Sequence, residues 1–264
     1  MTGFRSVRVA LGLAAASVLL TGCVGTAGAS SGSAASSPEQ GETLTVFAAA
    51  SLTETFTELA DRFEAANPGV TVTLNFAGSA DLVTQIREGA PADVFAAADL
   101  SNMAELSRDG LVAGDPAVFA TNTLSIAVPP DNPAGIDSFA DLAAPNVDVV
   151  VCAPQVPCGA ALPALEAAAG VRLAPVSEEN AVTDVLGKVT SGQADAGLVY
   201  VTDVASAGDA VLGLPVPESD QPVNEYPIAV VAGSGQARLG ASFARFVTGA
   251  TGQTVLGAAG FGAP

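Results

Sequence analysis

The stretch that decides the fold is Thr43–Ser51, TLTVFAAAS, which runs directly into LTETFTELADRF. Its β-branched and aromatic residues, Thr45–Phe47, predict a buried β-strand. The three alanines that follow are small enough for another group to approach the backbone. Ser51 is then a typical N-cap for the helix that the apolar spacing predicts over residues 52–66. A serine at such a junction offers a hydroxyl and free backbone N–H groups at the positive end of the helix dipole, which together can hold an anion.

Strands and helices alternate along the rest of the chain. Predicted strands at 70–76 and 93–97 are each followed by a helix, the second near residues 100–108, and the same order returns with a strand at 147–152 and a helix at 159–169. A further strand is expected at 121–128, and residues 177–180 are expected to open a helix that runs to about residue 191. This alternation is typical of a parallel sheet covered by helices on both faces. The number of units suits two α/β lobes better than one, with chain crossings near residues 120–124 and 223–228.

Composition excludes several classes of function. The chain has 264 residues, with 9 Lys and Arg against 27 Asp and Glu, and a formal net charge of −18. Nucleic acids and anionic membrane surfaces require a basic footprint, so neither is expected as a partner. Histidine is absent, which removes Ser-His-Asp and Cys-His catalysis and His-based metal sites. We expect no enzyme, and any bound anion must be held by a local site that works against the overall field.

The N-terminus predicts export. Two arginines precede a short apolar run, Val9–Leu20, which ends in Leu-Thr-Gly before Cys23. The run is short for a membrane span, and the pattern resembles a bacterial lipoprotein signal. We expect a signal peptide over residues 1–22, a lipid on Cys23 that anchors the protein to the cell membrane, and a flexible Gly/Ser/Ala tether that completes residues 23–42. The alternative is an ordinary secretory signal, and both place the protein outside the cytoplasm.

Two further cysteines, Cys152 and Cys158, flank the segment CAPQVPC. In an exported protein, cysteines this close favour a short-loop disulfide. Two free buried thiols are the alternative. A metal site built from two cysteines without histidine is less favoured than either.

Four other polar or small groups follow predicted strands. They are Ser79 after Gly78, Cys158 at the start of a helix, Val182 in the first turn of another, and Tyr200 at the end of DAGLVY. Ligands of open α/β sheets bind at these carboxyl ends, where helix N-termini point. Each group also has an ordinary structural interpretation. The serines would cap helices, Ser51 in a capping box with Glu54, and Tyr200 would be a half-buried aromatic with its hydroxyl in water.

Four blocks of the sequence carry a family resemblance: TVFAAASLTETF, FAGSADLVTQIREGAPADVFAAAD, ADAGLVYVTDV and EYPIAVV. In this order they resemble the periplasmic molybdate-binding proteins of ABC transporters, over nearly all of residues 43–264. The resemblance implies a type II periplasmic-binding fold with two lobes, a hinge and an interlobe ligand cleft. Lobe 1 would comprise residues 43–121 and 226–264, and lobe 2 residues 122–225. It also implies a monomer without a cofactor that captures molybdate, and tungstate too, and delivers it to a membrane permease.

The resemblance also implies the ligand set. Ser51, Ser79 and Tyr200 would contribute hydroxyls, and Cys158 and Val182 would contribute backbone N–H groups. Molybdenum would then be held only as its oxyanion, with no protein atom bonded to the metal. The sequence departs from the family in two places. Thr183 stands where the family usually has arginine. The loop before Cys158 is shorter than in the family and is bounded by cysteines, so a disulfide, rather than a longer loop, would hold this segment in position.

This ligand set agrees with the chemistry of a tetrahedral dianion. Stripped of water, such an ion needs several donors and no nearby carboxylate. Hydrogen phosphate would also require an acceptor, whereas molybdate, tungstate and sulfate would not. Two alternatives stay open: the same fold binding another ligand, such as sulfate or an organic acid, and an exported hydrolase that uses Ser51. The hydrolase is disfavoured because the chain has no histidine, no G-x-S-x-G motif and no lysine partner for the serine.

Overall fold

The computed structural model describes residues 41–217 and 224–264, and all of them belong to one compact unit, Glu39–Pro264. The predicted signal peptide, the lipid on Cys23 and nearly all of the tether lie outside the described residues. Within the described part of the chain, no helix has the length and apolar character needed to cross a membrane.

The first sheet contains the stretch that opens the sequence. Its strands lie in the order β2-β1-β3-β10-β4, and their bounds are β1 Glu42–Ala49, β2 Val70–Ala77, β3 Val94–Ala96, β4 Val112–Asn122 and β10 Asn224–Val231. β1 pairs in parallel with β2 and β3, but β10 runs antiparallel to β3 and β4. The expectation of a parallel sheet is therefore wrong for this edge, because β10 brings the chain back from the second sheet in the opposite direction.

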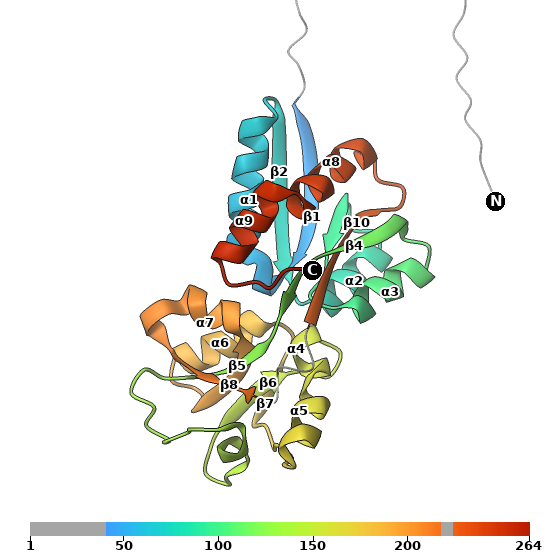
Figure 1. The fold of residues 1–264 in the computed structure, drawn as a ribbon. Coiled ribbons are helices and arrows are strands. Elements are labelled where there is room, and N and C mark those ends of the chain that lie inside the picture. Colours follow the sequence, from blue (N-terminus) through green and yellow to red (C-terminus); the bar gives the residue numbers. More distant parts are fainter. Residues whose placement is uncertain (1–40, 218–223) are drawn as a thin grey trace, which may run out of the picture. The chain divides into compact units, whose positions relative to one another are not determined.

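Helices cover both faces of the first sheet (Figure 1). Their bounds are α1 Thr53–Ala66, α2 Ser79–Arg87, α3 Leu100–Arg108, α8 Ala237–Thr248 and α9 Ala250–Ala258. One hydrophobic core joins α1, α8 and α9 to the sheet, and it is built around edge-to-face phenylalanines such as Phe56, Phe63 and Phe243. A second core joins α2 and α3 to the other face through Leu82, Ile86 and Leu106.

The second sheet has the strand order β7-β6-β8-β5-β9 and a single core. Its strands are β5 Leu124–Val128, β6 Val149–Cys152, β7 Ser177–Glu179, β8 Ala196–Tyr200 and β9 Leu212–Pro215. Its helices are α4 Pro157–Ala160, α5 Leu162–Ala169, α6 Val182–Thr190 and α7 Val201–Ala207. This sheet is also mixed, because β5 runs antiparallel to β8 and β9. The predicted class, two α/β lobes, is confirmed.

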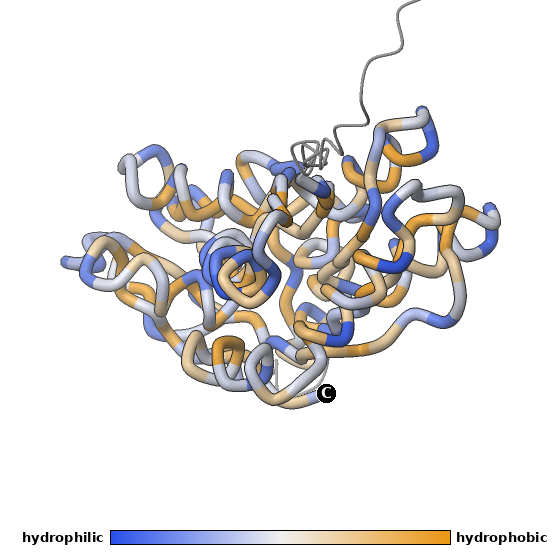
Figure 2. Tube along the Cα trace, turned by 90° about the horizontal axis from the view of Figure 1, so that it is seen from above, coloured by the Kyte–Doolittle hydropathy of each residue, from blue (hydrophilic) through white to orange (hydrophobic). Residues whose placement is uncertain are grey.

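Short 3-10 turns complete the architecture, at η1 Ala50–Leu52, η2 Phe139–Ala143 and η3 Gly208–Ala210. The chain leaves the first sheet at Asn122, enters the second at Leu124 and re-enters the first with β10 at Asn224. Figure 2 shows hydrophilic and hydrophobic residues alternating along the helices, as expected for helices with one face on a core.

Three local predictions are wrong. The single helix expected over 159–169 is broken into α4 and α5, because Pro163 lacks an N–H and sits in the first turn of α5. Residues 177–179 were expected to open a helix but pair with β6 as strand β7. β4 begins at Val112, well before the strand expected from residue 121, because its pairing partner β10 is distant in sequence.

Candidate anion-binding site

One small pocket brings together the five residues that the sequence singles out. Elements of both sheets line it: Ala49, Ala50, Ser51, Gly78, Ser79, Ala98, Val156, Pro157, Cys158, Val182 and Tyr200. Its cavity volume is about 10 Å³, close to the space of a single water molecule and far below the roughly 300–1,000 Å³ typical of sites for drug-sized ligands. The pocket therefore suits a small ion or molecule.

The lining of this pocket is uncharged. No Asp, Glu, Lys or Arg is among its residues. Across the described residues, no group of three or more Cys, Asp and Glu side chains is placed to hold a metal ion. The polar groups that remain are hydroxyls and backbone amides, which can donate hydrogen bonds to an anion.

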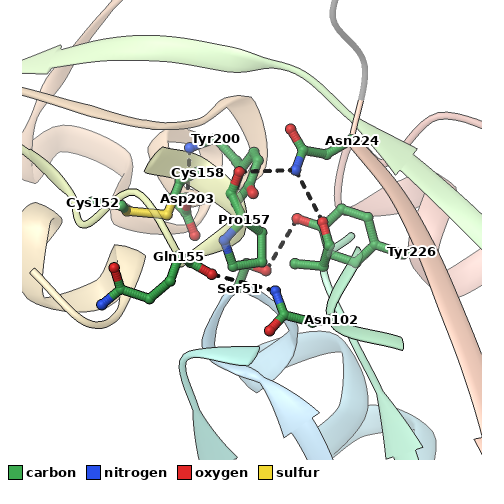
Figure 3. The surroundings of a disulfide bond; sticks show 11 residues. Ser51, Asn102, Cys152, Gln155, Pro157, Cys158, Tyr200, Asp203, Asn224 and Tyr226 are labelled. Atoms are coloured by element: carbon green, nitrogen blue, oxygen red, sulfur yellow. Dashed lines mark hydrogen bonds between the residues drawn. A yellow bond between two sulfur atoms is a disulfide. The ribbon is translucent and has the colours of Figure 1, made fainter. Parts of the chain in front are cut away.

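Ser51 lies in η1 with a half-buried side chain, and it is not the N-cap of α1 as predicted. The cap position falls on Leu52, which makes no side-chain capping bond. A 3-10 turn precedes the helix here, and Thr53 Oγ1 donates to Ala50 O at 2.7 Å. The Ser51 hydroxyl instead lies 3.1 Å from Tyr226 Oη (Figure 3). Helix capping therefore does not use this hydroxyl.

Ser79 is the first residue of α2, and the N-cap is Gly78 rather than Ser79. The side chain is only 1 % exposed. Its Oγ accepts a hydrogen bond from the backbone N–H of Ala98 at 3.0 Å. Since the oxygen accepts, the hydroxyl proton is free to donate into the pocket.

Gly78 allows the two sides of the pocket to approach each other. A Cβ atom at this position would lie 1.9 Å from the backbone oxygen of Asn180, just before α6. Only a residue without a side chain fits between these backbones. The contact sets the turn before α2 against the N-terminus of α6.

Cys158 and Cys152 form a disulfide with a Cα–Cα distance of 5.6 Å (Figure 3). The bond ties the end of β6 to the second residue of α4 and closes the loop between them. The turn is tight, because a Cβ atom on Gly159 would lie 2.1 Å from Ala153 O. The disulfide therefore restrains the backbone that carries the Cys158 N–H.

Val182 is the first residue of α6, and Ala181 is its N-cap. The first N–H groups of an α-helix have no acceptor within the helix. The Val182 side chain is buried, so its backbone, rather than its side chain, is the polar part that the residue brings to the pocket.

Tyr200 ends β8 and is 1 % exposed, so the interpretation as a half-buried ring with a solvated hydroxyl is wrong. Its hydroxyl has no hydrogen-bond partner among the described residues. Burial raises the pKa of this hydroxyl well above its ordinary value, helped by the neighbouring Tyr226 and Asp203. Tyr200 is therefore a protonated donor without an acceptor.

Several polar residues around the pocket were not singled out from the sequence. Asn224 Nδ2 donates to Ala98 O at 3.0 Å and to Pro157 O at 3.3 Å, which links the two sides of the pocket (Figure 3). Tyr226, which meets Ser51, is fully buried. Both belong to β10, far from the pocket in sequence. The only available signal was their position at the second chain crossing.

A small uncharged pocket of hydrogen-bond donors, lined by elements of two α/β sheets, is typical of a protein that binds a small solute. Residues 44–262 match the family described as bacterial extracellular solute-binding protein, and the chain belongs to this family. The chain is 47 % identical over 261 residues to the molybdate-binding protein ModA of Mycobacterium tuberculosis, covering 98 % of this chain and 100 % of the relative. It is 33 % identical over 214 residues to the molybdate-binding protein ModA of Escherichia coli, covering 76 % and 81 %.

Solved structures share the fold. The periplasmic molybdate-binding protein of Azotobacter vinelandii matches with a TM-score of 0.74 at 22 % identity, over 84 % of this chain and 99 % of that chain. The sulfate-binding protein SubI of Mycobacterium tuberculosis matches with a TM-score of 0.70 at 23 % identity, over 83 % and 86 %. The predicted periplasmic-binding fold is confirmed, and the relatives are binding proteins rather than enzymes.

Proposed function

We propose that this protein captures molybdate, and tungstate as well, outside the cytoplasm and delivers the oxyanion to an ABC permease in the membrane. The observation that carries the proposal is the convergence of Ser51, Ser79, Cys158, Val182 and Tyr200 on one small uncharged pocket. These are the five residues expected to donate hydrogen bonds to the anion.

The donors match what a desolvated dianion requires. The Ser79 proton is free because its oxygen accepts from Ala98 N–H, and the Tyr200 hydroxyl has no acceptor among the described residues. The N-terminus of α6 adds roughly half a unit of positive charge at Val182. An anion of two negative charges can thus be stabilised without lysine or arginine, through several hydrogen bonds of the stronger, charge-assisted kind.

The lining also supports selection against protonated anions. It offers no carboxylate, and hydrogen phosphate would need such an acceptor for its own proton. Molybdate, tungstate and sulfate have no proton to place. The relatives that are named for molybdate, at 47 % and 33 % identity, favour the larger oxyanions over sulfate.

The domain assignment is part of the same proposal. Lobe 1 comprises residues 43–121 and 226–264, lobe 2 comprises residues 122–225, and the lobes close over the anion about the two crossings. Support comes from Asn224, which donates to Ala98 O of lobe 1, and from Gly78, whose backbone lies against Asn180 O of lobe 2. The proposal also includes export by a signal peptide at residues 1–22, a lipid on Cys23, a tether that extends to residue 42, and a monomeric state.

Calorimetric titration tests the proposal directly. The protein without its signal peptide is titrated with molybdate, tungstate and sulfate, and its Ser79→Ala variant serves as the control for the site. We expect molybdate and tungstate to bind tightly, sulfate to bind far more weakly, and the variant to lose affinity. Equal binding of sulfate would overturn the selectivity, and no binding of any of the three would overturn the function. A mass spectrum of the exported protein tests the lipid on Cys23.

A further inference from the structure

Behind Ser51 lies a buried row of polar groups that the pocket does not contain. Ser51 Oγ is 3.1 Å from Tyr226 Oη, and Tyr226 Oη is 3.4 Å from Asn122 Nδ2. Asn122 Nδ2 also donates to Thr202 Oγ1 at 2.8 Å. Tyr226 is 0 % exposed and Asn122 is 3 % exposed, so water does not compete with the bonds of Asn122, whereas the Ser51–Tyr226 bond is only partly buried. Each buried polar atom of this row needs its partner.

The orientation of the Asn122 amide gives this row a direction. Asn122 Oδ1 accepts from the backbone N–H of Thr123 at 3.0 Å, which identifies the oxygen, because a backbone N–H can only donate. The amide nitrogen therefore faces Thr202 and Tyr226, with one hydrogen for each. Tyr226 Oη must accept from Asn122, so its own proton points elsewhere.

The nearest acceptor for the Tyr226 proton is Ser51 Oγ, and either atom of this pair could be the donor. Burial raises the pKa of Tyr226 beyond its ordinary range, so the proton is retained. Two hydroxyls face Tyr226 Oη: that of Ser51 lies within hydrogen-bond distance at 3.1 Å, whereas that of Tyr200 does not meet hydrogen-bond geometry. When Ser51 Oγ accepts from Tyr226, its own single proton is left to donate to the pocket.

We propose that Asn122 and Tyr226 are positioning residues that turn the Ser51 hydroxyl proton toward the bound anion, in a relay from Asn122 N–H to Tyr226 O–H to Ser51 O–H. The inference rests on the proposed function and deepens it. Neither residue touches the anion. In such a row each donated bond polarises the next, so the relay also makes Ser51 a stronger donor. At Ser79 a single backbone N–H, that of Ala98, donates to the hydroxyl oxygen and leaves its proton for the anion in the same way.

A double-mutant cycle tests the relay. Molybdate affinity is measured by calorimetry for the wild type, Tyr226→Phe, Ser51→Ala and the double variant. We expect Tyr226→Phe to weaken binding by about three- to tenfold in the wild type and to have no effect once Ser51 is alanine. The matched control is the same cycle with Ser79→Ala, whose hydroxyl is held by Ala98. In the Ser79→Ala background, Tyr226→Phe should weaken molybdate binding by the same factor as in the wild type.

The outcomes separate the relay from its alternatives. An equal loss in the Ser51→Ala and wild-type backgrounds would overturn the relay and make Tyr226 a packing residue. Unchanged affinity of Tyr226→Phe would also overturn it. A wild-type chain that binds none of the oxyanions would overturn the proposed function, and the relay with it.

A second measurement needs no anion. The chain has 2 tyrosines, so labelling their ring carbon next to the hydroxyl gives two NMR signals, which Tyr226→Phe assigns. The Tyr226 signal should shift in Ser51→Ala and stay in place in Ser79→Ala. A Tyr226 signal that ignores the Ser51 substitution would overturn the contact on which the relay depends.

Discussion

The two sides of the pocket supply donors in different ways. The first sheet contributes side-chain hydroxyls, Ser51 and Ser79, each held by a buried partner. The second sheet contributes mostly backbone, at Cys158 and Val182, with Tyr200 as its one hydroxyl. A hydroxyl depends on the identity of its residue, whereas a backbone N–H depends on where the chain runs. Substitutions should therefore act through chemistry on the first side and through geometry on the second.

The largest effect is expected where the two sides meet, at Gly78. In Gly78→Ala the new methyl group would overlap Asn180 O, a backbone atom that has little room to move. Forcing the sides apart should cost about 3 kcal/mol of molybdate binding, or roughly 100-fold. The measurement is calorimetry. Gly187→Ala is the matched control, since nothing lies within 4 Å of that Cβ position, and it should bind like the wild type. Tight binding by Gly78→Ala would mean that the sides need not approach.

The serines should show the next largest effect. Ser51→Ala and Ser79→Ala each remove one hydroxyl that we propose donates to the anion, so each should weaken binding by about 1–3 kcal/mol. Val182→Ala tests the contrast, because its backbone donor remains. It should lower the melting temperature through the lost packing of a buried side chain, yet leave the affinity within about threefold. A Val182 variant as weak as the serine variants would erase the difference between the two sides.

The disulfide tests geometry on the second side. Replacing Cys152 and Cys158 together by serine should lower the free energy of unfolding by about 2 kcal/mol, as for other short loops. Molybdate binding should weaken by a smaller amount, about 1 kcal/mol, because the N–H of residue 158 remains but is less well positioned. Urea melts and titrations, with and without reductant, measure both. Binding that survives unchanged would show that α4 alone holds this loop.

A prediction about stability rather than binding concerns Asp203, which accepts from the Tyr200 backbone N–H at 2.8 Å and lines the neighbouring pocket. Burial raises the pKa of its carboxyl to about 7. The folded state therefore holds a proton that the unfolded state has released, and this group's contribution to stability falls as the pH rises from about 4 to about 7. Asp203→Asn keeps the acceptor but cannot ionise. The melting temperature of the variant relative to the wild type should rise between about pH 5 and pH 8, and a constant difference would contradict the raised pKa.

The sequence predicts local features of the fold better than it predicts contacts between distant segments. The bounds of α3 match the expected range, and α1 differs by one residue, because their apolar spacing and flanking turns are local. The five pocket residues were found because each follows a strand, where ligands of this fold bind. Tyr226 and Asn224 were missed because their partners lie far away in the chain. The serine caps were wrong because Tyr226 and Ala98 compete for the same hydroxyls.

The uncharged lining has a kinetic consequence. A net charge of −18 repels an incoming dianion, and the pocket has no cation to attract it from a distance. Added salt shortens the range of this repulsion. Capture should therefore become faster as ionic strength rises, the reverse of the behaviour of proteins that steer their anions with lysine and arginine. Release of the anion depends on short hydrogen bonds inside the pocket, so its rate should change little with ionic strength.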